Sequence, residues 1–126
     1  MKNIWAAFIL FAIMIIGISF STNVLNKNCI HLQEMNTSLE SYISKEEYTR
    51  AYNLSIDYIA QWKKTSKILT VYLHHEDLDH INNELLKLTQ YIKIEDKSES
   101  LATVHGMKYL LDHIIEHEKV TISNMF

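Results

Sequence analysis

The sequence predicts an all-α protein in which an N-terminal transmembrane helix is followed by a small up-down four-helix bundle. Two observations on composition support this prediction. No charged side chain occurs from Asn3 to Asn26, and the chain contains no proline and only one glycine, Gly106, after that stretch. A third is that apolar residues after the stretch recur at the three- and four-residue spacing of helix faces. Turns and strands need more glycine and proline than this chain has.

The first predicted element is the apolar run from Ile4 to Phe20. A helix from Ile4 to Leu25 would be about 33 Å long, which is enough to cross a hydrocarbon core of about 30 Å. We therefore divide the chain into a transmembrane anchor, residues 1–26, and a helical bundle domain, residues 27–126.

A cleaved signal peptide is the alternative interpretation of this run. Lys2 precedes it, and Ser19 and Ser21 are small residues suited to a cleavage site. The length of the run and the lack of a helix breaker after it favour an uncleaved anchor in contact with membrane lipid.

Orientation and pairing of the anchor follow from a few residues. Lys2 and the amino terminus lie on one side of the run, and Lys27 alone lies close to it on the other. This bias predicts a single-pass protein of the cell membrane with a cytoplasmic N-terminus and an extracytoplasmic bundle. Gly17 and Ser21 form a pair of small residues four apart, which would let two anchor helices approach as a homodimer.

The bundle begins with a helix that is able to continue the membrane span without a break. Its predicted core face carries Leu25, Cys29, Leu32, Asn36, Leu39 and Ile43. This helix is expected to end near Ile43, because Ser44 and Glu47 match a capping box and Ile43 and Tyr48 match a hydrophobic staple. Cys29 is the only cysteine, so the chain cannot form an internal disulfide.

Three further helices follow from the same spacing. The second is predicted to bury Tyr48, Tyr52, Ser55, Ile59, Trp62, Ser66, Leu69 and Leu73, with a turn or kink at His74 to Asp77. The third is predicted to bury Leu78, Ile81, Leu85, Leu88 and Ile92 and to end near Lys93. Asp96 and Glu99 then predict a cap that opens the fourth, which carries Leu101, Val104, Met107, Leu111 and Ile114. The two hairpins look only loosely similar, so we infer no internal repeat.

Up-down connectivity would gather histidines and carboxylates at the membrane-proximal end of the bundle. The residues concerned are His74, His75, Glu76, Asp79 and His80 together with His113, Glu116, His117 and Glu118. His75 with Asp79, and His113 with His117, have the four-residue spacing at which helices present metal ligands. Histidines at helix ends also cap carbonyl groups or respond to pH, so these four are candidate ligands only, and no metal or other cofactor is assigned.

Composition and motifs exclude several functions. The net charge of −3 and the lack of a basic patch interleaved with aromatic residues argue against nucleic acid as a partner. No nucleophile with an oriented base and no phosphate-binding glycine loop can be identified, so we do not expect an enzyme. The apolar tail Val120, Ile122, Met125 and Phe126 is expected to emerge near the membrane.

Several stretches resemble an uncharacterised family of short, single-span helical proteins from spore-forming, low-GC bacteria. They are YLHHEDLDHI (Tyr72 to Ile81), QYIKIEDKSESLA (Gln90 to Ala102) and LLDHIIEHEKVTISNMF (Leu110 to Phe126), together with the N-terminal MKNIW. The resemblance covers most of the chain and assigns no catalytic residue. It implies a setting beside multi-span membrane proteins, since members of the family are often encoded next to them.

Two functional hypotheses follow. The first is a membrane-anchored interaction module, an accessory subunit of a multi-span membrane protein, because a small anchored bundle without a reaction centre suits binding better than chemistry. Its candidate partner contacts are Gly17, Ser21, His80, Met125 and Phe126. The alternative is a metal- or pH-responsive sensor that uses the membrane-proximal histidines and carboxylates.

Overall fold

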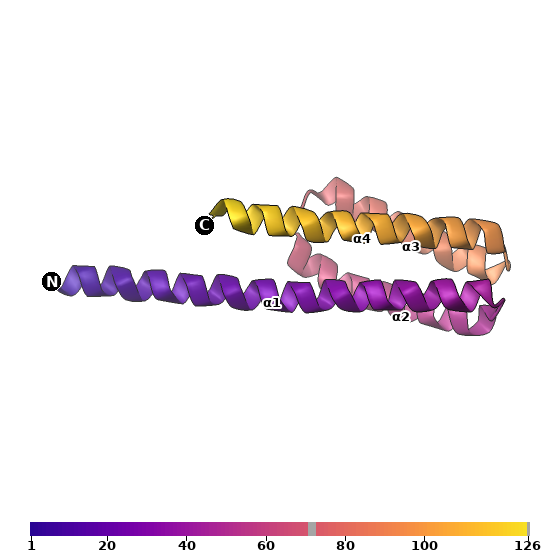
Figure 1. The fold of residues 1–126 in the computed structure, drawn as a ribbon, viewed down its shortest axis with the longest axis horizontal. Coiled ribbons are helices and arrows are strands. Elements are labelled where there is room, and N and C mark those ends of the chain that lie inside the picture. The colour runs from indigo at the N-terminus through magenta and orange to yellow at the C-terminus, as the bar shows by residue number, and fades with distance from the viewer. Residues whose placement is uncertain (71–72, 126) are drawn as a thin grey trace.

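The computed structural model describes the backbone of residues 1–70 and 73–125 and the side chains of residues 1–20, 23–70 and 73–116. Four helices make up this part of the chain: α1, Lys2–Ser44; α2, Tyr48–Leu69; α3, His75–Lys93; and α4, Lys97–Met125 (Figure 1). Helices α1 and α3 each pack against both α2 and α4, which closes a ring of four antiparallel helices. The predicted all-α bundle is confirmed.

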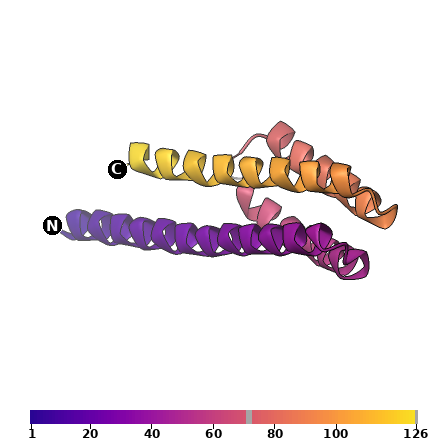
Figure 2. The ribbon, with the colours of Figure 1, turned by 45° about the vertical axis from the view of Figure 1, so that its right-hand side comes forward.

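Helix α1 is a single uninterrupted helix of 43 residues. At the usual helical rise it is about 64 Å long, roughly twice the thickness of a hydrocarbon core. Its N-terminal part projects from one end of the bundle, which we call the anchor end (Figures 1 and 2). Among the side chains that the structure describes, the first buried one of α1 is Leu25, so much of the N-terminal half of the helix lies outside the bundle core.

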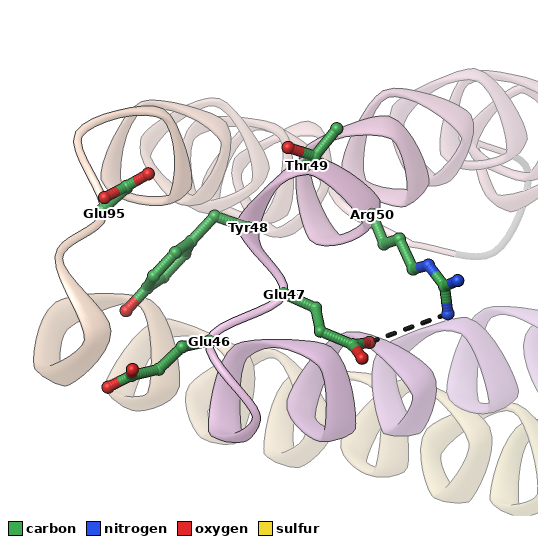
Figure 3. A pocket seen from close by; sticks show the side chains of 6 residues that line it. All are labelled: Glu46, Glu47, Tyr48, Thr49, Arg50 and Glu95. Atoms are coloured by element: carbon green, nitrogen blue, oxygen red, sulfur yellow. Dashed lines mark ion pairs between the residues drawn. The ribbon is translucent and has the colours of Figure 1, made fainter.

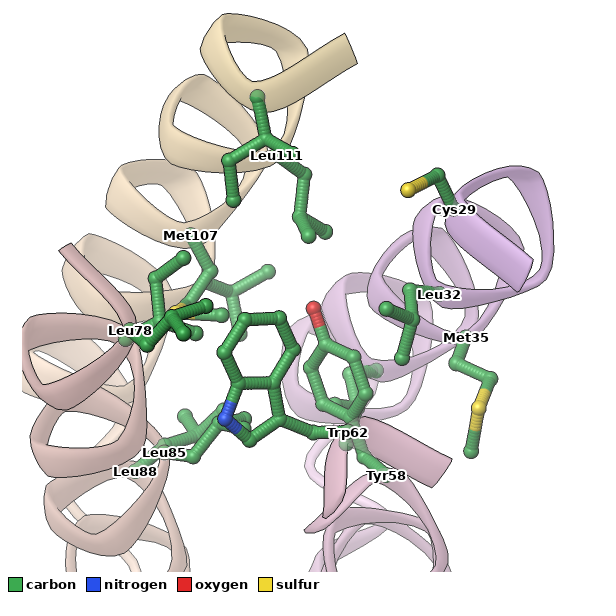
Figure 4. Close-up of a cluster of buried hydrophobic side chains, with 14 of the residues drawn as sticks. Cys29, Leu32, Met35, Tyr58, Trp62, Leu78, Leu85, Leu88, Met107 and Leu111 are labelled. Atoms are coloured by element: carbon green, nitrogen blue, oxygen red, sulfur yellow. The ribbon is translucent and has the colours of Figure 1, made fainter. Parts of the chain in front are cut away.

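The core confirms the faces predicted for α1 and α3. Every residue on those two predicted faces is buried, as are Val104, Met107, Leu111 and Ile114 of α4. Figure 4 shows how these side chains meet around Trp62 at the centre of the bundle. Leu101, which was predicted to be in the core, is only half-buried, because Ser100 and Thr103 occupy the inner positions of the first turns of α4.

The face predicted for α2 is partly wrong. Ser55, Trp62 and Leu69 are buried as expected. The other central positions are taken by Ala51, Tyr58 and Thr65, while Tyr48, Tyr52, Ile59 and Ser66 are half-buried beside them. The buried face of α2 is therefore rotated by part of a turn from the predicted one, and it includes the small residues Ala51 and Thr65 as well as Tyr58. Helix α2 also ends at Leu69, before the predicted Leu73.

The capping box predicted for the start of α2 is wrong as well. Ser44 is the last residue of α1, Glu47 is the N-cap of α2, and no side chain makes a hydrogen bond at this cap. The turn instead uses Glu46, whose φ of 61° is in the left-handed region, and the N–H of Glu47 donates to the carbonyl of Tyr42 at 2.9 Å. This is the main-chain pattern of a Schellman motif, and it terminates α1 without a glycine.

The second cap is confirmed, and the turn before it repeats the first. The backbone N–H of Glu99 donates to Oδ1 of Asp96 at 3.1 Å, as the sequence predicts for a helix start. Immediately upstream, Glu95 has a φ of 58°, and the N–H of Asp96 donates to the carbonyl of Tyr91 at 2.9 Å. The α1–α2 and α3–α4 turns therefore share one geometry at the end opposite the anchor, the distal end.

The similarity extends through both hairpins in the pattern of burial, although residues at many of the matching positions differ in type. Buried residues of α1–α2 correspond to buried residues of α3–α4 at a constant separation of 49 residues, as between Cys29 and Leu78. The other pairs are Leu32 with Ile81, Asn36 with Leu85, Leu39 with Leu88, Ile43 with Ile92, Ala51 with Ser100, Ser55 with Val104, Tyr58 with Met107, Trp62 with Leu111 and Thr65 with Ile114. The bundle is thus two equivalent helical hairpins.

One buried polar group breaks this equivalence. Nδ2 of Asn36 donates to the carbonyl of Val104 at 3.0 Å, and the hydroxyl of Tyr58 donates to Oδ1 of Asn36 at 3.3 Å. Burial raises the pKa of Tyr58, so its hydroxyl stays protonated and remains a donor. The corresponding residues of the other hairpin, Leu85 and Met107, are apolar. These hydrogen bonds tie α1 to both α2 and α4 and fix their register.

Candidate functional site

Three histidines line one cavity at the anchor end of the bundle. The cavity has a volume of about 140 Å³ between the start of α3 and the second half of α4. Its polar residues are His74, Asp77, His80 and His113, all exposed at the rim, and its apolar residues are Leu73, Ile81, Leu110 and Ile114. Histidines distant in the sequence therefore meet here, next to one carboxylate.

The other histidine of this region lies in a different groove. His75 and Asp79 line a space of about 190 Å³ between α2 and α3, together with Trp62, Lys63 and other residues of α2. His75 is the first residue of α3, and His74 before it is the N-cap with extended backbone, so the two neighbouring side chains leave the chain in different directions. His75 therefore faces α2, while His74 and His80 border α4.

The candidate metal ligands are consequently not gathered into one set. His75 and Asp79 line the α2–α3 groove, His113 lines the α3–α4 cavity, and the side chain of His117 lies outside the described residues. Among the side chains that the structure describes, no group of three or more His, Cys, Asp or Glu residues is placed to hold a metal ion.

Of the candidate partner contacts, Gly17, His80 and the backbone of Met125 lie on the described part of the chain towards the anchor end. Gly17 is exposed on α1, and a Cβ built there would have no neighbour within 4 Å. His80 lines the histidine cavity. Met125 is the last residue of α4, which continues past the end of α2 alongside α1 (Figures 1 and 2). The side chains of Ser21 and Met125, and the whole of Phe126, lie outside the described residues.

The projecting part of α1 carries most of the exposed large apolar side chains of the described chain. Large side chains from Ile4 to Phe20 are mostly exposed, for example Phe8 at 70% and Phe20 at 71%. By length and composition, α1 is able to cross a membrane, and none of its most apolar window is buried. A helix that is apolar all round and has no protein cover needs lipid or other apolar partners around it.

Sequence reasoning missed a pocket at the distal end. It has a volume of about 300 Å³ and is lined by Glu46, Glu47, Tyr48, Thr49, Arg50 and Glu95 (Figure 3). Partial burial, and then the charges of Glu46, Glu95 and Asp96, raise the pKa of Tyr48. Arg50 pairs with Glu47 at 3.9 Å. The signal in the sequence was the shared Tyr-Ile-x-x-Glu-acidic pattern that ends α1 and α3.

Sequence reasoning also missed a cluster of lysines near the end of α2. Lys63, Lys64 and Lys67 are exposed, and no acidic residue lies between Ala60 and Thr70. The spacing was visible in the sequence. A functional interpretation of these lysines depends on the height at which the fold places them along α1. The connectivity of the helices alone does not give that height.

Comparison with known proteins identifies the family to which this chain belongs. Neither a search of curated proteins nor a search of solved structures finds a match to this chain. A model of one protein family matches residues 19–125, which include the end of the apolar run, the rest of α1 and the whole of α2, α3 and α4. The chain therefore belongs to the family described as Domain of unknown function (DUF4363).

Proposed function

We propose that this protein is a membrane-anchored helical interaction module that serves as an accessory subunit of a multi-span membrane protein. The observation that carries the proposal is the uncovered apolar part of α1, which continues without a break into the bundle. Membrane lipid would surround this segment, and a partner would contact part of it. A bundle tied so closely to the bilayer stays within nanometres of an integral partner, so weak contacts would suffice.

The anchor end is the part of the bundle best suited to such a partner. It combines the exposed Gly17 on α1 with the cavity bordered by His80 and with the end of α4 at Met125. Small residues such as Gly17 and Ser21 allow close helix–helix contact within a bilayer. The same pair would also support a homodimer, so the two kinds of partner have to be distinguished by experiment.

A topology experiment tests the anchor and its orientation. We propose a cytoplasmic N-terminus and an extracytoplasmic bundle, because Lys2 and the amino terminus precede the apolar run. Protease added to intact cells is expected to remove a C-terminal tag while the N-terminal segment stays in the membrane fraction. A protected tag would reverse the orientation. A soluble mature chain that begins near Thr22 would replace the anchor with a cleaved signal peptide.

A crosslinking experiment tests the partner. Photoreactive residues placed at Gly17, His80 and Met125 in native membranes are expected to capture one discrete multi-span protein, identified by mass spectrometry. The same residue at Lys97 serves as the control, because it lies at the distal end, where it pairs with Glu46 at 3.6 Å. Capture of lipid alone would contradict the accessory role, and capture of a second copy would indicate self-association instead.

A proton-responsive sensor is the second candidate. The specific observation in its favour is that His74, His80 and His113 border one cavity beside Asp77. Histidine is the side chain that most readily changes charge near neutral pH, and protonation there would place positive charge beside a carboxylate. Crosslinking from Met125 at neutral and mildly acidic pH keeps all three histidines and separates the candidates: a sensor should change its captured partner or yield with pH, and a constitutive subunit should not.

A further inference from the structure

Four lysines form an exposed basic surface near the anchor end, which we call the lysine face. Lys63, Lys64 and Lys67 lie on α2, Lys27 lies on α1, and all four are exposed. The ion pairs of the described residues involve none of them. Their charges are therefore available to a partner outside the bundle.

The hydrogen bond between Tyr58 and Asn36 fixes the height of these lysines along α1. Because α1 and α2 are antiparallel, each step towards the end of α2 matches one step back along α1. Lys67 is nine residues after Tyr58, and Lys27 is nine residues before Asn36, so the two lie at the same height. Lys63 and Lys64 lie about one helical turn farther from the anchor.

The opposite side of the anchor end has the opposite charge. Glu76, Asp77 and Asp79 begin α3, and Asp112 and Glu116 lie on α4, all of them exposed. Lys63 and Asp79 border the same groove between the two sides, but they do not form an ion pair. The end of the bundle that faces the apolar segment is thus basic on α1–α2 and acidic on α3–α4.

The lysine face lies at the height of lipid headgroups if the apolar run occupies the bilayer. Lys27 is seven residues after Phe20, which is about 10 Å along α1. The headgroup layer on each side of a hydrocarbon core is roughly 5–8 Å thick. Lysine side chains are long and extend toward such a surface, and electrostatic attraction acts over about 10 Å at 0.1 M salt.

We propose that the lysine face binds the anionic headgroups of the bilayer that holds the anchor. This proposal rests on the membrane anchoring proposed above and not on the orientation of the anchor. Clusters of about four or more basic residues on the cytoplasmic side of a span bind anionic lipids, and the same attraction acts at any leaflet that contains such lipids. The acidic side on α3 and α4 is repelled by it. Because α1 is one continuous helix, attraction on one side tilts the anchor and the bundle together.

The tilt can be measured on the full chain in lipid vesicles with two fluorescent labels. One label is attached in an Ala60→Cys variant, on the exposed side of α2, and the other in an Asn83→Cys variant, on the exposed side of α3. Trp62 and Asn82 border the same groove, so the two labels lie at a similar height on adjacent helices, one on the basic side of the bundle and the other on the acidic side. The native Cys29 is 1% exposed and is shielded from the labelling reagent.

Quenching by lipids with spin-labelled headgroups reports how close each label lies to the membrane surface. In phosphatidylcholine vesicles we expect similar quenching of both labels. With phosphatidylglycerol added, the ratio of Ala60 to Asn83 quenching should rise by at least about twofold, because each lysine near an anionic surface favours contact by roughly fivefold. About 1 M salt, where the Debye length falls to about 3 Å, should abolish the rise.

Two triple variants distinguish an effect of the position of the lysines from an effect of the total charge of the chain. Changing Lys63, Lys64 and Lys67 to glutamine should remove the rise in the quenching ratio. The matched control, Lys87→Gln with Lys93→Gln and Lys108→Gln, makes the same charge change at exposed residues of α3 and α4 and should keep the rise. Circular dichroism of all variants checks that the bundle remains helical.

Flotation of the vesicles distinguishes failure of this proposal from failure of the anchor. If the chain floats with both kinds of vesicle and the quenching ratio does not change, the lysine face is overturned and the anchor stands. If the chain floats with neither kind of vesicle, both the lysine face and the anchor are overturned. If it floats only with phosphatidylglycerol present, the lysine face is supported and the anchor is wrong.

Discussion

Replacing Trp62 with alanine is expected to lower the free energy of unfolding of the bundle by about 3–5 kcal/mol. Trp62 is the largest of the fully buried side chains, with 2% of its surface exposed. Figure 4 shows its ring between side chains of both hairpins, including Tyr58 and Met107. Truncation removes the contacts of the indole ring and leaves a cavity that the surrounding helices fill only in part.

Urea unfolding of the full chain in mild detergent, followed by helical circular dichroism, measures this loss. Trp5→Ala is the matched control, because Trp5 is 69% exposed on the projecting part of α1. The control should unfold at the same urea concentration as the unchanged chain. A Trp62→Ala variant as stable as the control would mean that the two hairpins do not pack around the indole.

The faces of α1 and α3 could be predicted because leucine and isoleucine at helical spacing mark most of their positions. Leu32, Leu39 and Ile43 follow this spacing on α1, and Leu85, Leu88 and Ile92 follow it on α3. A single amphipathic pattern then has one solution. The continuity of α1 was likewise expected, since nothing between the apolar run and the bundle breaks a helix.

The face of α2 could not be read from side-chain size. Tyr52 and Ile59 looked like better core residues than Ala51 and Thr65, yet the last two are the buried ones. Tyr58 is fully buried because Asn36 accepts the hydrogen bond of its hydroxyl. That partner lies on another helix, so the position of Tyr58 depends on tertiary contacts that a local pattern does not contain.

The candidate site was likewise predictable from the sequence only in part. Connectivity predicts the height of a residue along the bundle, and His74, His75, His80 and His113 do lie towards one end. It does not predict the side of the helix, which separates His75 from the cavity that the other three border. The lysine face was missed because its meaning depends on the alignment of α2 with α1.

Because the two hairpins are so similar, the buried hydrogen bonds of Asn36 and Tyr58 can determine how the hairpins align with each other. Two similar hairpins with wholly apolar interfaces could slide along each other or exchange partners, because their core layers would be interchangeable. Asn36 and Tyr58 have Leu85 and Met107 as counterparts, so the hydrogen bonds form in only one arrangement. We infer that this group specifies the register of α1 against α2 and α4, as a single buried asparagine does in coiled coils.

Replacing Asn36 with aspartate is therefore expected to cost about 3–4 kcal/mol of stability at pH 7. The introduced carboxylate could still accept from Tyr58, but it cannot donate to the carbonyl of Val104, and it would be a charge in a site that is 2% exposed. Burial raises the pKa of a carboxyl by about 3 units or more, and each unit corresponds to about 1.4 kcal/mol. Urea unfolding in mild detergent measures the loss.

The pH dependence of that loss separates charge from shape. A carboxyl whose pKa is raised by folding destabilises the native state only where the unfolded chain is ionised, so the cost should disappear below about pH 4. There the protonated group can donate to Val104 and accept from Tyr58, as the asparagine does. Asn53→Asp, at an exposed position of α2, is the control and should cost little at either pH. A loss at Asn36 that persists below about pH 4 would mean that the charge of the carboxylate does not cause it, and this account of the buried group would then be wrong.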